Sequence, residues 1–568
     1  MHYPEVFAAI EGVTSPEGPF PIVEQEIDGI PQKVFGGLPD NLRDYFAFSA
    51  SHGDKECLID QDRRMSFTDV ANQVASLGAA LAGQYGVAKG DRVAIAMRNS
   101  PEWCVSFMAI TSIGAVAVPM NSWWQGEELA YGLKDSGAKY IILDSARYER
   151  LASHLQDSVL IVIGVENEGK TLPDDVDRLE PLLTGEGVLP EVLIEPQDPA
   201  IILYTSGSTG RPRGVLSTQR NVLSALGTWL AIGTAVAIAS GTIGQEPEQQ
   251  PAILLTVPLF HVTGLNSLFL LSLGIGRKIV MMYKWDIDAA LKVIQAEKIT
   301  HFNGVPTMSM ELMNHPHRDE FDLSSLQEIA SGGAARPSDQ VGTLIERFPG
   351  AKPSAGYGLT ETNAVGCIIG DDDYEGRPGS VGQATPPLVD LRLVDEDGKE
   401  VEQGERGEIC LRSPAIVSGY LNQPAATEAS FKNGWFHTGD IGYQDEEGFV
   451  FIVDRIKEII IRGGENVSCT EVEEAIYSHP DCLEAAVFSI PDERLGEIVG
   501  AAVHIRSDSD IDDAQMKSFL NDKLAKFKVP VHIWICQESL PRIASGKIFK
   551  KQIQAECVAK LDLGSSTY

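Results

Sequence analysis

The strongest constraint on the fold is a regular alternation of apolar, strand-like runs with amphipathic, helix-like segments, which starts near residue 65. The runs DRVAIAM, AVAVPM and KYIILD are typical of strands, and the intervening PEWCVSFMAITSIG and EELAYGLKDSG are typical of helices. The pattern returns in AIILYTS, AILLTVPL, KIVMMY and LQEIASGG. Because strands that alternate with helices form parallel sheets, we predict an α/β fold that binds ligands at the carboxyl ends of its strands.

The character of the sequence changes twice after this region. Near residue 380, short apolar runs separated by Asp-Gly and Glu-Gly turns predict an antiparallel β subdomain. After DRIKEIIIRGGEN the order becomes helix, strand, strand, helix, which predicts a small α+β unit. A chain of 568 residues is too long for one core. We therefore expect one domain over residues 1–454 and a second over residues 455–568.

The charge balance argues against two classes of partner. The chain has 46 Lys+Arg against 80 Asp+Glu, a net charge of −34, which disfavours nucleic acids and anionic membrane surfaces. An anionic ligand must therefore be held by a local cluster of donors. Residues 221–245 and 265–276 are strongly apolar, but their small residues and strand–helix context favour buried helices over membrane spans.

The cysteines and the amino terminus indicate the compartment. The eight cysteines are scattered without a C-x-x-C pair, which is typical of free thiols in a reducing environment. The sequence MHYPEVFAAIEG lacks the basic and apolar regions of a signal peptide. We expect a cytoplasmic protein.

One loop has the composition of an anion-binding site. In YTSGSTGRPRGV, two glycines and four hydroxyl residues follow a buried strand, so backbone N–H groups and hydroxyls can converge on phosphate oxygens. The spacing does not match a Walker A loop. A flexible Gly/Ser linker is the competing interpretation, and the position directly after a strand argues against it.

This loop and six further motifs resemble those of the adenylate-forming superfamily, which includes acyl-CoA synthetases, peptide-synthetase adenylation domains and firefly luciferase. The other motifs follow in order along the chain: PLFHVTG, SGGAA, YGLTET, WFHTGD, DRIKEIIIRGGENV and PRIASGKIFKK. The resemblance implies a large adenylation domain and a small mobile carboxyl-terminal domain. One departure is Arg213, which stands where the family usually has lysine and keeps the positive charge in a planar group.

The resemblance implies a set of ATP-binding residues, namely Thr205, Ser206, Gly207, Ser208, Thr209, Gly210, Arg213, Gly332, Gly333, Ala334, Tyr357, Gly358, Thr360, Asp440, Ile452, Arg455, Lys457, Gly463, Gly464 and Lys547. Among these, Tyr357 is expected to stack on adenine and Asp440 to bind the ribose hydroxyls. Glu361, with Thr205, is expected to bind Mg²⁺, because a carboxylate beside phosphates needs a cation between them. A helix-terminal carboxylate is the alternative interpretation of Glu361.

Lys547, His261, Thr205 and Glu361 are the catalytic residues that the resemblance implies. The ammonium group of Lys547 would offset negative charge as the acid attacks the α-phosphate. His261 would lie near the acyl carboxylate, although a structural core histidine is a close alternative. Lys457 corresponds to the family's hinge, about which the small domain rotates so that Gly463 and Gly464 line a passage for pantetheine.

Together these features predict an ATP-dependent carboxylic acid–coenzyme A ligase that needs ATP, Mg²⁺ and coenzyme A, and that functions as a monomer or a homodimer. The apolar segments predict a hydrophobic monocarboxylate, either a medium- or long-chain fatty acid or a bulky cyclic or aryl acid. Three alternatives stay open: a ligase that loads a carrier protein, a luciferase-like oxidase, and a non-catalytic nucleotide or acyl sensor.

Overall fold

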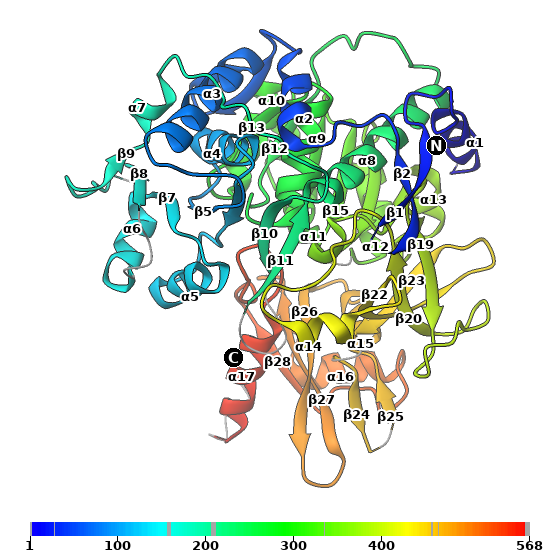
Figure 1. The fold of residues 1–568 in the computed structure, drawn as a ribbon. Helices are drawn as coiled ribbons and strands as arrows, with labels where there is room; N and C mark the ends of the chain where they lie inside the picture. Colours follow the sequence, from blue (N-terminus) through cyan, green and yellow to red (C-terminus); the bar gives the residue numbers. More distant parts are fainter. Residues whose placement is uncertain are drawn as a thin grey trace.

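A seven-stranded sheet forms the first layer of the large region in the computed structural model (Figure 1). The structure describes residues 3–27, 29–155, 161–167, 169–205, 212–333, 336–455, 458–463 and 465–562. The strand order is β11 (Arg213–Thr218), β10 (Pro199–Thr205), β6 (Val116–Pro119), β5 (Arg92–Ala96), β7 (Tyr140–Asp144), β8 (Ile161–Val165) and β9 (Asp177–Arg178). All neighbours are parallel except β10 and β11, which form an antiparallel hairpin.

A second, nine-stranded sheet also has a parallel centre. Its order is β18 (Gln383–Ala384), β17 (Cys367–Gly370), β16 (Lys352–Tyr357), β15 (Glu328–Gly332), β14 (His301–Gly304), β12 (Ala252–Leu255), β13 (Lys278–Met281), β3 (Glu56–Asp60) and β4 (Arg63–Ser66). The antiparallel pairs lie at its two edges. The predicted α/β fold with largely parallel sheets is confirmed. A separate hairpin joins β1 (Ile22–Ile27) and β2 (Ile30–Phe35).

Helices bury the main core between the two sheets. Trp103 and Phe107 of α4 stack at 5.5 Å, and Phe107 meets Phe269 edge-on, so that residues from both sheets share one apolar cluster. The helices of the large region are α1 (Tyr3–Val13), α2 (Leu42–Ala50), α3 (Phe67–Gly83), α4 (Pro101–Ser112), α5 (Gly126–Ser136), α6 (Ser145–Leu151), η1 (Ala152–His154), α7 (Glu180–Leu183), α8 (Gln219–Ala239), η2 (Thr263–Leu270), α9 (Leu271–Gly274), α10 (Ile287–Glu297), α11 (Pro306–Asn314), η3 (Arg318–Glu320), α12 (Asp339–Arg347), η4 (Thr360–Thr362) and α13 (Asp371–Gly376).

Helix α8 contains most of the apolar stretch at residues 221–245. Thr218 caps its amino terminus by accepting a hydrogen bond from the N–H of Asn221, whose side chain bonds back to Thr218. The helix is long and apolar enough to cross a membrane, but half of its apolar window is buried inside the large region. The buried side includes Val222, Leu226 and Ala231. Its composition therefore reflects packing in the protein interior.

The predicted β subdomain is a five-stranded antiparallel sheet over the described residues. It contains β19 (Asp390–Val394), β20 (Gly407–Arg412), β21 (Phe431–Lys432), β22 (Trp435–Gln444) and β23 (Val450–Arg455), with α14 (Pro424–Ser430) beside it. Ile409, Leu411 and Val450 bury its inner face. Strand β23 is the last element before the chain enters the small region.

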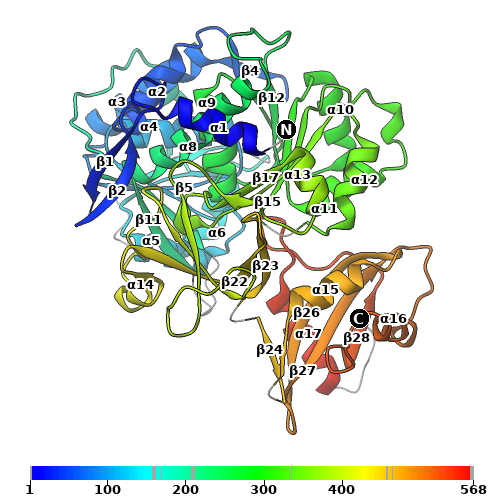
Figure 2. The ribbon, with the colours of Figure 1, turned by 90° about the vertical axis from the view of Figure 1, so that its right-hand side faces the viewer.

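The small region packs helices against both faces of one sheet (Figure 2). Its strands are β24 (Ile460–Arg462), β25 (Glu465–Val467), β26 (Cys482–Asp492), β27 (Gly496–Ile505) and β28 (His532–Cys536), and its helices are α15 (Cys469–Tyr477), α16 (Asp513–Asn521) and α17 (Lys550–Asp562). The segment before α17, red in Figure 2, rises from this sheet to the large region. The predicted helix–strand–strand–helix order is correct for α15 to α16, but it omits β24, β25, β28 and α17.

Candidate active site

The predicted phosphate loop connects the two strands of the β10–β11 hairpin. Thr205 ends β10 and lies opposite Arg213, the first residue of β11. Ser206, Gly207, Ser208, Thr209 and Gly210 lie outside the described residues, so their predicted contacts with phosphate stay predictions. The sequence predicts a loop that follows a strand, and the structure has this strand as β10. The antiparallel return strand β11 was not predicted. It places Arg213 beside the start of the loop.

Arg213, Tyr420 and Glu361 form a connected group next to this hairpin. The guanidinium carbon of Arg213 lies 5.4 Å from the ring centroid of Tyr420, within the range of a cation–π contact. The hydroxyl of Tyr420 donates a 2.8 Å hydrogen bond to Oε1 of Glu361. Sequence reasoning missed Tyr420, because it lies 59 residues from Glu361 and outside the recognised motifs.

Glu361 fits the predicted role of a Mg²⁺ ligand. It is buried in η4, and this burial raises the pKa of its carboxyl above the usual range; the Tyr420 hydrogen bond and the charges of Arg455 and Arg213 only partly offset the effect. A divalent cation beside the carboxylate would keep it ionised. The carboxylate of Glu361 and the hydroxyl of Thr205 are both hard oxygen donors of the kind that Mg²⁺ prefers.

Asn363 is a second residue that sequence reasoning missed. It follows Glu361 in the chain and adopts a left-handed backbone conformation with φ 50°. Its buried side chain donates to the carbonyl of Ala415 at 2.8 Å and accepts from Asn266 at 3.0 Å. These bonds hold the sharp turn that follows η4, and so they fix the direction of Glu361. A single Asn in a turn offers no sequence signal that separates this role from an ordinary loop.

Tyr357, Asp440 and Arg455 meet at the end of the second sheet. The hydroxyl of Tyr357 donates a 2.7 Å hydrogen bond to Oδ2 of Asp440, and Nε of Arg455 lies 2.8 Å from Oδ1. Asp440 and Arg455 are also direct partners in the pairing of β22 with β23. Burial and the Asp440 carboxylate raise the pKa of Tyr357 well above its usual value, so this phenol stays protonated. The structure brings the three predicted residues together.

Lys547 reaches the large region from a tight hairpin of the small region. The N–H of Ile543 donates to the carbonyl of Lys547 at 2.9 Å, and Gly546 takes a left-handed conformation with φ +85°. The Lys547 side chain passes so close to Gly333 that a Cβ there would lie 3.1 Å from its Cε. Burial, followed by repulsion from Arg455, lowers the pKa of Lys547 to about 8. The ammonium therefore sits in a poorly hydrated place.

His261 lines the same small cavity as Lys547, whose other lining residues are Val257, Thr263, Val305, Gly332, Gly333 and Ser545. The backbone N–H of Thr263 donates to Nδ1 of His261 at 3.3 Å, which leaves the proton of the neutral ring on Nε2. Burial and then the Lys547 charge lower the pKa of His261 to about 3. The ring is therefore neutral at physiological pH and faces the cavity that holds the lysine.

Two protein-family models match the chain. The model of the AMP-binding enzyme family matches residues 46–421, and the model of the AMP-binding enzyme C-terminal domain matches residues 471–547. The chain belongs to the AMP-binding enzyme family. The predicted relationship to acyl-CoA synthetases of the adenylate-forming superfamily is thereby confirmed.

Curated relatives and solved structures agree with this family. The chain is 30% identical over 542 residues to 4-coumarate-CoA ligase 1 of Narcissus pseudonarcissus, covering 93% of this chain and 96% of the relative. It is 32% identical over 536 residues to the long-chain-fatty-acid–CoA ligase of Bacillus subtilis, covering 89% and 93%. The o-succinylbenzoate CoA synthetase of Bacillus subtilis, solved with ATP and magnesium, superposes with a TM-score of 0.73 at 27% identity, covering 89% and 98%.

The AMP-binding enzyme is thus an AMP-forming acid–thiol ligase of the acyl-CoA synthetase type, with ATP, Mg²⁺ and coenzyme A as cofactors and co-substrates.

Three further residues that the sequence predicts for the ATP site lie near its described parts. Gly358 packs so closely that a Cβ would meet the carbonyl carbon of Ala364 at 2.4 Å. Thr360 begins η4, and Ile452 is half-buried in β23.

Some predicted residues are not brought to this site. Gly463 lies at the β24–β25 turn of the small region, where its N–H donates to the carbonyl of Leu495 at 2.8 Å. Ala334, Lys457 and Gly464 lie outside the described residues, so their roles stay predictions. Before the predicted hinge, Asp454 accepts a 2.8 Å hydrogen bond from the N–H of Cys469 at the start of α15.

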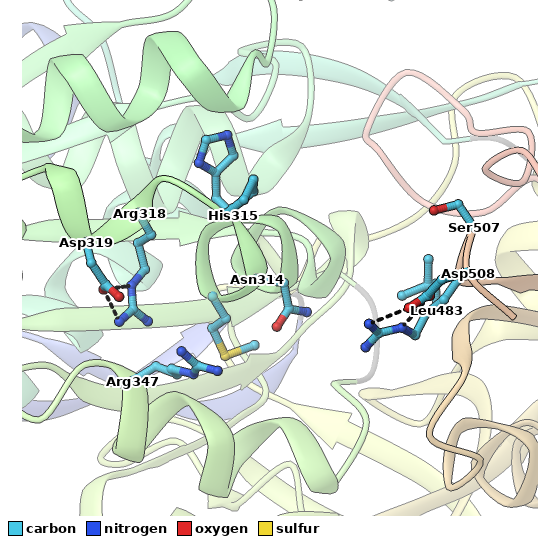
Figure 3. Close-up of a pocket in the computed structure, with 11 residues that line it drawn as sticks. Asn314, His315, Arg318, Asp319, Arg347, Leu483, Ser507 and Asp508 are labelled. Carbon is cyan, nitrogen blue, oxygen red and sulfur yellow. Dashed lines mark hydrogen bonds and ion pairs between the residues drawn. The ribbon is translucent and has the colours of Figure 1, made fainter.

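A larger hollow of about 510 Å³ opens where the large and small regions face each other (Figure 3). In Figure 3, Arg318 and Arg347 lie on one side of it and Asp508 on the other. Arg318 pairs with Asp319, and Arg506, which also lines the hollow, pairs with Asp508. None of the described residues predicted for the active site lines this hollow. It is distinct from the cavity of Lys547.

Proposed function

We propose that this AMP-binding enzyme activates a hydrophobic monocarboxylic acid, most simply a medium- or long-chain fatty acid, and transfers the acyl group to coenzyme A. The observation that carries the proposal is the close approach of the Lys547 side chain to Gly333 in one cavity with His261. The uncharged lining of that cavity beside Lys547, with Val257 and Val305, supports an apolar acid. An aryl acid is the second candidate, supported by the similarity to a 4-coumarate-CoA ligase.

In the first proposed step, a carboxylate oxygen of the acid attacks the α-phosphorus of ATP. A new O–P bond forms, the bond to the β-phosphate oxygen breaks, and pyrophosphate leaves with that electron pair. We propose that the ammonium of Lys547 contacts both the carboxylate and the α-phosphate and offsets the negative charge that accumulates between them. The neutral ring of His261 lets the carboxylate enter without a competing cation.

The nucleotide is proposed to lie along Gly332, Gly333 and Tyr357, with its ribose hydroxyls on Asp440. Support comes from the carboxylate of Asp440, which Tyr357 and Arg455 hold in one orientation. Thr205 and Glu361 are proposed to hold Mg²⁺. When bound, the metal draws negative charge from the phosphate oxygens and makes pyrophosphate a better leaving group.

In the second proposed step, the thiol sulfur of coenzyme A attacks the acyl carbonyl carbon. A C–S bond forms, the C–O bond to AMP breaks, and the thiol proton passes to solvent. For this step we propose that residues 455–568 rotate as a unit about Lys457, which withdraws Lys547 and brings Gly463 and Gly464 toward the adenylate. Rotation would separate Gly546 from Val305, which lie so close that a Cβ on Gly546 would be 3.0 Å from Cγ2 of Val305.

The test measures pyrophosphate release from MgATP over a panel of carboxylic acids, with and without coenzyme A, for wild type and Lys547→Ala. We expect release that is stimulated by coenzyme A, varies with the length of the acid, and falls by about 100- to 1,000-fold in the variant. A synthetic acyl-adenylate supplied with coenzyme A should still react in Lys547→Ala. Release that never acylates coenzyme A would support a carrier-protein ligase, and no release with any acid would contradict the proposal.

A further inference from the structure

The side-chain amide oxygen of Asn303, a half-buried residue near the cavity of Lys547, is itself buried and has no hydrogen-bond partner among the described residues. Asn303 lies in β14. Almost all buried polar groups in folded proteins are paired, and an unpaired amide oxygen is costly. A buried group that the chain leaves unpaired is open to a partner from outside it, such as water, an ion or a ligand.

Asn303 lies near the cavity in which the carboxylate of the substrate is proposed to react. An ideal Cβ at Gly332 would lie 3.9 Å from Oδ1 of Asn303 and 3.9 Å from Cγ2 of Thr263. Gly332 and Thr263 both line the cavity that contains Lys547 and His261. Because Gly332 has no side chain, nothing from that residue fills the space between the amide and this cavity. The next residue before Asn303 in the strand, Phe302, points to the opposite face, into an apolar core.

Asn303 shares its face of the sheet with charged residues, and these lie farther from the cavity than Asn303 does. His301 and Glu328 are the first residues of β14 and β15, so they lie at the ends of the strands away from the cavity. Arg277 interacts electrostatically with both of them. Asn303 therefore presents a neutral amide next to the cavity.

We propose that Asn303 is a specificity residue, and that the preferred acid carries a hydroxyl group close to its carboxylate on an otherwise apolar body. This inference rests on the proposed function and narrows its substrate class. A hydroxyl both donates and accepts, so it can bond to the amide oxygen or the amide nitrogen. If the acid carried a second carboxylate here, that group would face the neutral amide of Asn303, which has no positive charge to balance it.

The expected effect is large, because a site that hydrogen-bonds a substrate hydroxyl discriminates strongly against the analogue without it. The unhydroxylated acid leaves Oδ1 of Asn303 unpaired in the complex, whereas the hydroxylated acid donates a hydrogen bond to it. We expect a preference of at least about tenfold in kcat/KM.

The experiment uses matched acids and the full-length chain. Pyrophosphate release is measured for octanoate against 2-, 3- and 4-hydroxyoctanoate, and for benzoate against 2- and 3-hydroxybenzoate. Each pair is tested with wild type, Asn303→Leu, which has similar volume but no amide, and the control Asn521→Leu. Asn521 lies in α16 of the small region, where its side chain bonds to the carbonyl of Lys517.

We expect wild type and Asn521→Leu to prefer a hydroxylated acid at least about tenfold, and Asn303→Leu to lose that preference because its kcat/KM falls more for the hydroxylated acid than for the parent acid. No preference in wild type for any hydroxylated acid would overturn the inference, and this result needs no variant. An equal loss for both members of each pair in Asn303→Leu would overturn it as well. Absence of Lys547-dependent release with every acid would contradict the proposed function itself.

Discussion

At the scale of single residues, Lys547 has a proposed catalytic role and a pKa that falls in the measurable range. Burial lowers the pKa of this ammonium to about 8, so the free enzyme loses the charged form as the pH rises through that value. The proposed adenylation step needs the charged form. The pKa of His261, lowered to about 3, predicts that this ring contributes no ionisation between pH 5 and 8.

We therefore predict that kcat/KM for adenylation is level below pH 8 and falls about tenfold per pH unit above it. Stopped assays of pyrophosphate release between pH 6 and 10 measure this profile. Lys547→Arg should have lower activity but no alkaline decline, because its guanidinium stays protonated. Circular dichroism at each pH controls for unfolding. A wild-type profile that is flat to pH 10 would show that the ionisation of Lys547 does not limit the step.

Arg213 also permits a test at this scale. Its guanidinium lies over Tyr420, which in turn bonds to Glu361, so the planar group orders the residues proposed to face the phosphates. We predict that Arg213→Lys raises KM for MgATP about three- to tenfold, and that Arg213→Met reduces activity further because the charge is lost as well. Initial-rate kinetics with varied MgATP decide this. Equal kinetics for Arg213→Lys and wild type would mean that charge alone matters at this position.

At the scale of elements, the hairpin that carries Lys547 is held by an arginine that does not itself reach the cavity. Nη1 of Arg542 donates to the carbonyl of Gly546 at 2.6 Å, and Nη2 pairs with the buried carboxylate of Glu484 in β26. Glu484 also accepts a 2.6 Å hydrogen bond from the N–H of Leu540. Arg542 therefore ties the tip of the hairpin to the sheet of the small region, and we interpret it as a positioning residue.

Arg542→Met is predicted to lower adenylation about 10- to 100-fold, because a small displacement of a catalytic group has a large effect on rate. The conversion of a synthetic acyl-adenylate to its thioester should stay within about threefold of wild type, since Lys547 is proposed to act only in the first step. Arg506→Met, which removes an exposed arginine from the same region, is the matched control. A similar loss in both half-reactions would instead indicate a general defect of the small region.

The Lys547 side chain lies close to Gly333, and this proximity allows an independent test of the position of the lysine. Gly333 has φ +81°, and a Cβ would lie 3.1 Å from Cε of Lys547. We predict that Gly333→Ala reduces adenylation at least about tenfold, through backbone strain and displacement of the lysine. Gly376→Ala is the control, because a Cβ there meets nothing within 4 Å. Wild-type adenylation by Gly333→Ala would show that the lysine can be accommodated differently.

Much of the fold was predictable from the sequence, because strand and helix periodicities are local. The parallel strands β5, β6 and β7 and the helices between them follow directly from their apolar patterns. Strand β11 was not predicted, since Pro212 and Gly214 weaken its strand signal and its pairing with β10 supplies the order. The hydrogen bond from Tyr357 to Asp440 joins residues 83 positions apart, and only the resemblance to a family suggested that they meet.

At the scale of the whole molecule, net charge and substrate charge have the same sign. The chain carries a net charge of −34, and ATP and coenzyme A are both polyanions. In the proposed site, the local cations Arg213, Arg455 and Lys547 attract the nucleotide against an unfavourable long-range field. Salt screens the long-range repulsion between exposed charges more strongly than it screens short contacts in a poorly hydrated cavity.

We predict from this that kcat/KM for MgATP rises about two- to fivefold when KCl increases from about 10 to 150 mM, before it levels off. The direction is opposite to that of an enzyme whose positive field steers anions to its site. Initial rates at fixed free Mg²⁺ measure the effect, and the neutral osmolyte sucrose at matched osmolality controls for changes in water activity. A steady decline of kcat/KM over this range of KCl would mean that the local cations, and not the overall charge, determine the field that the nucleotide meets.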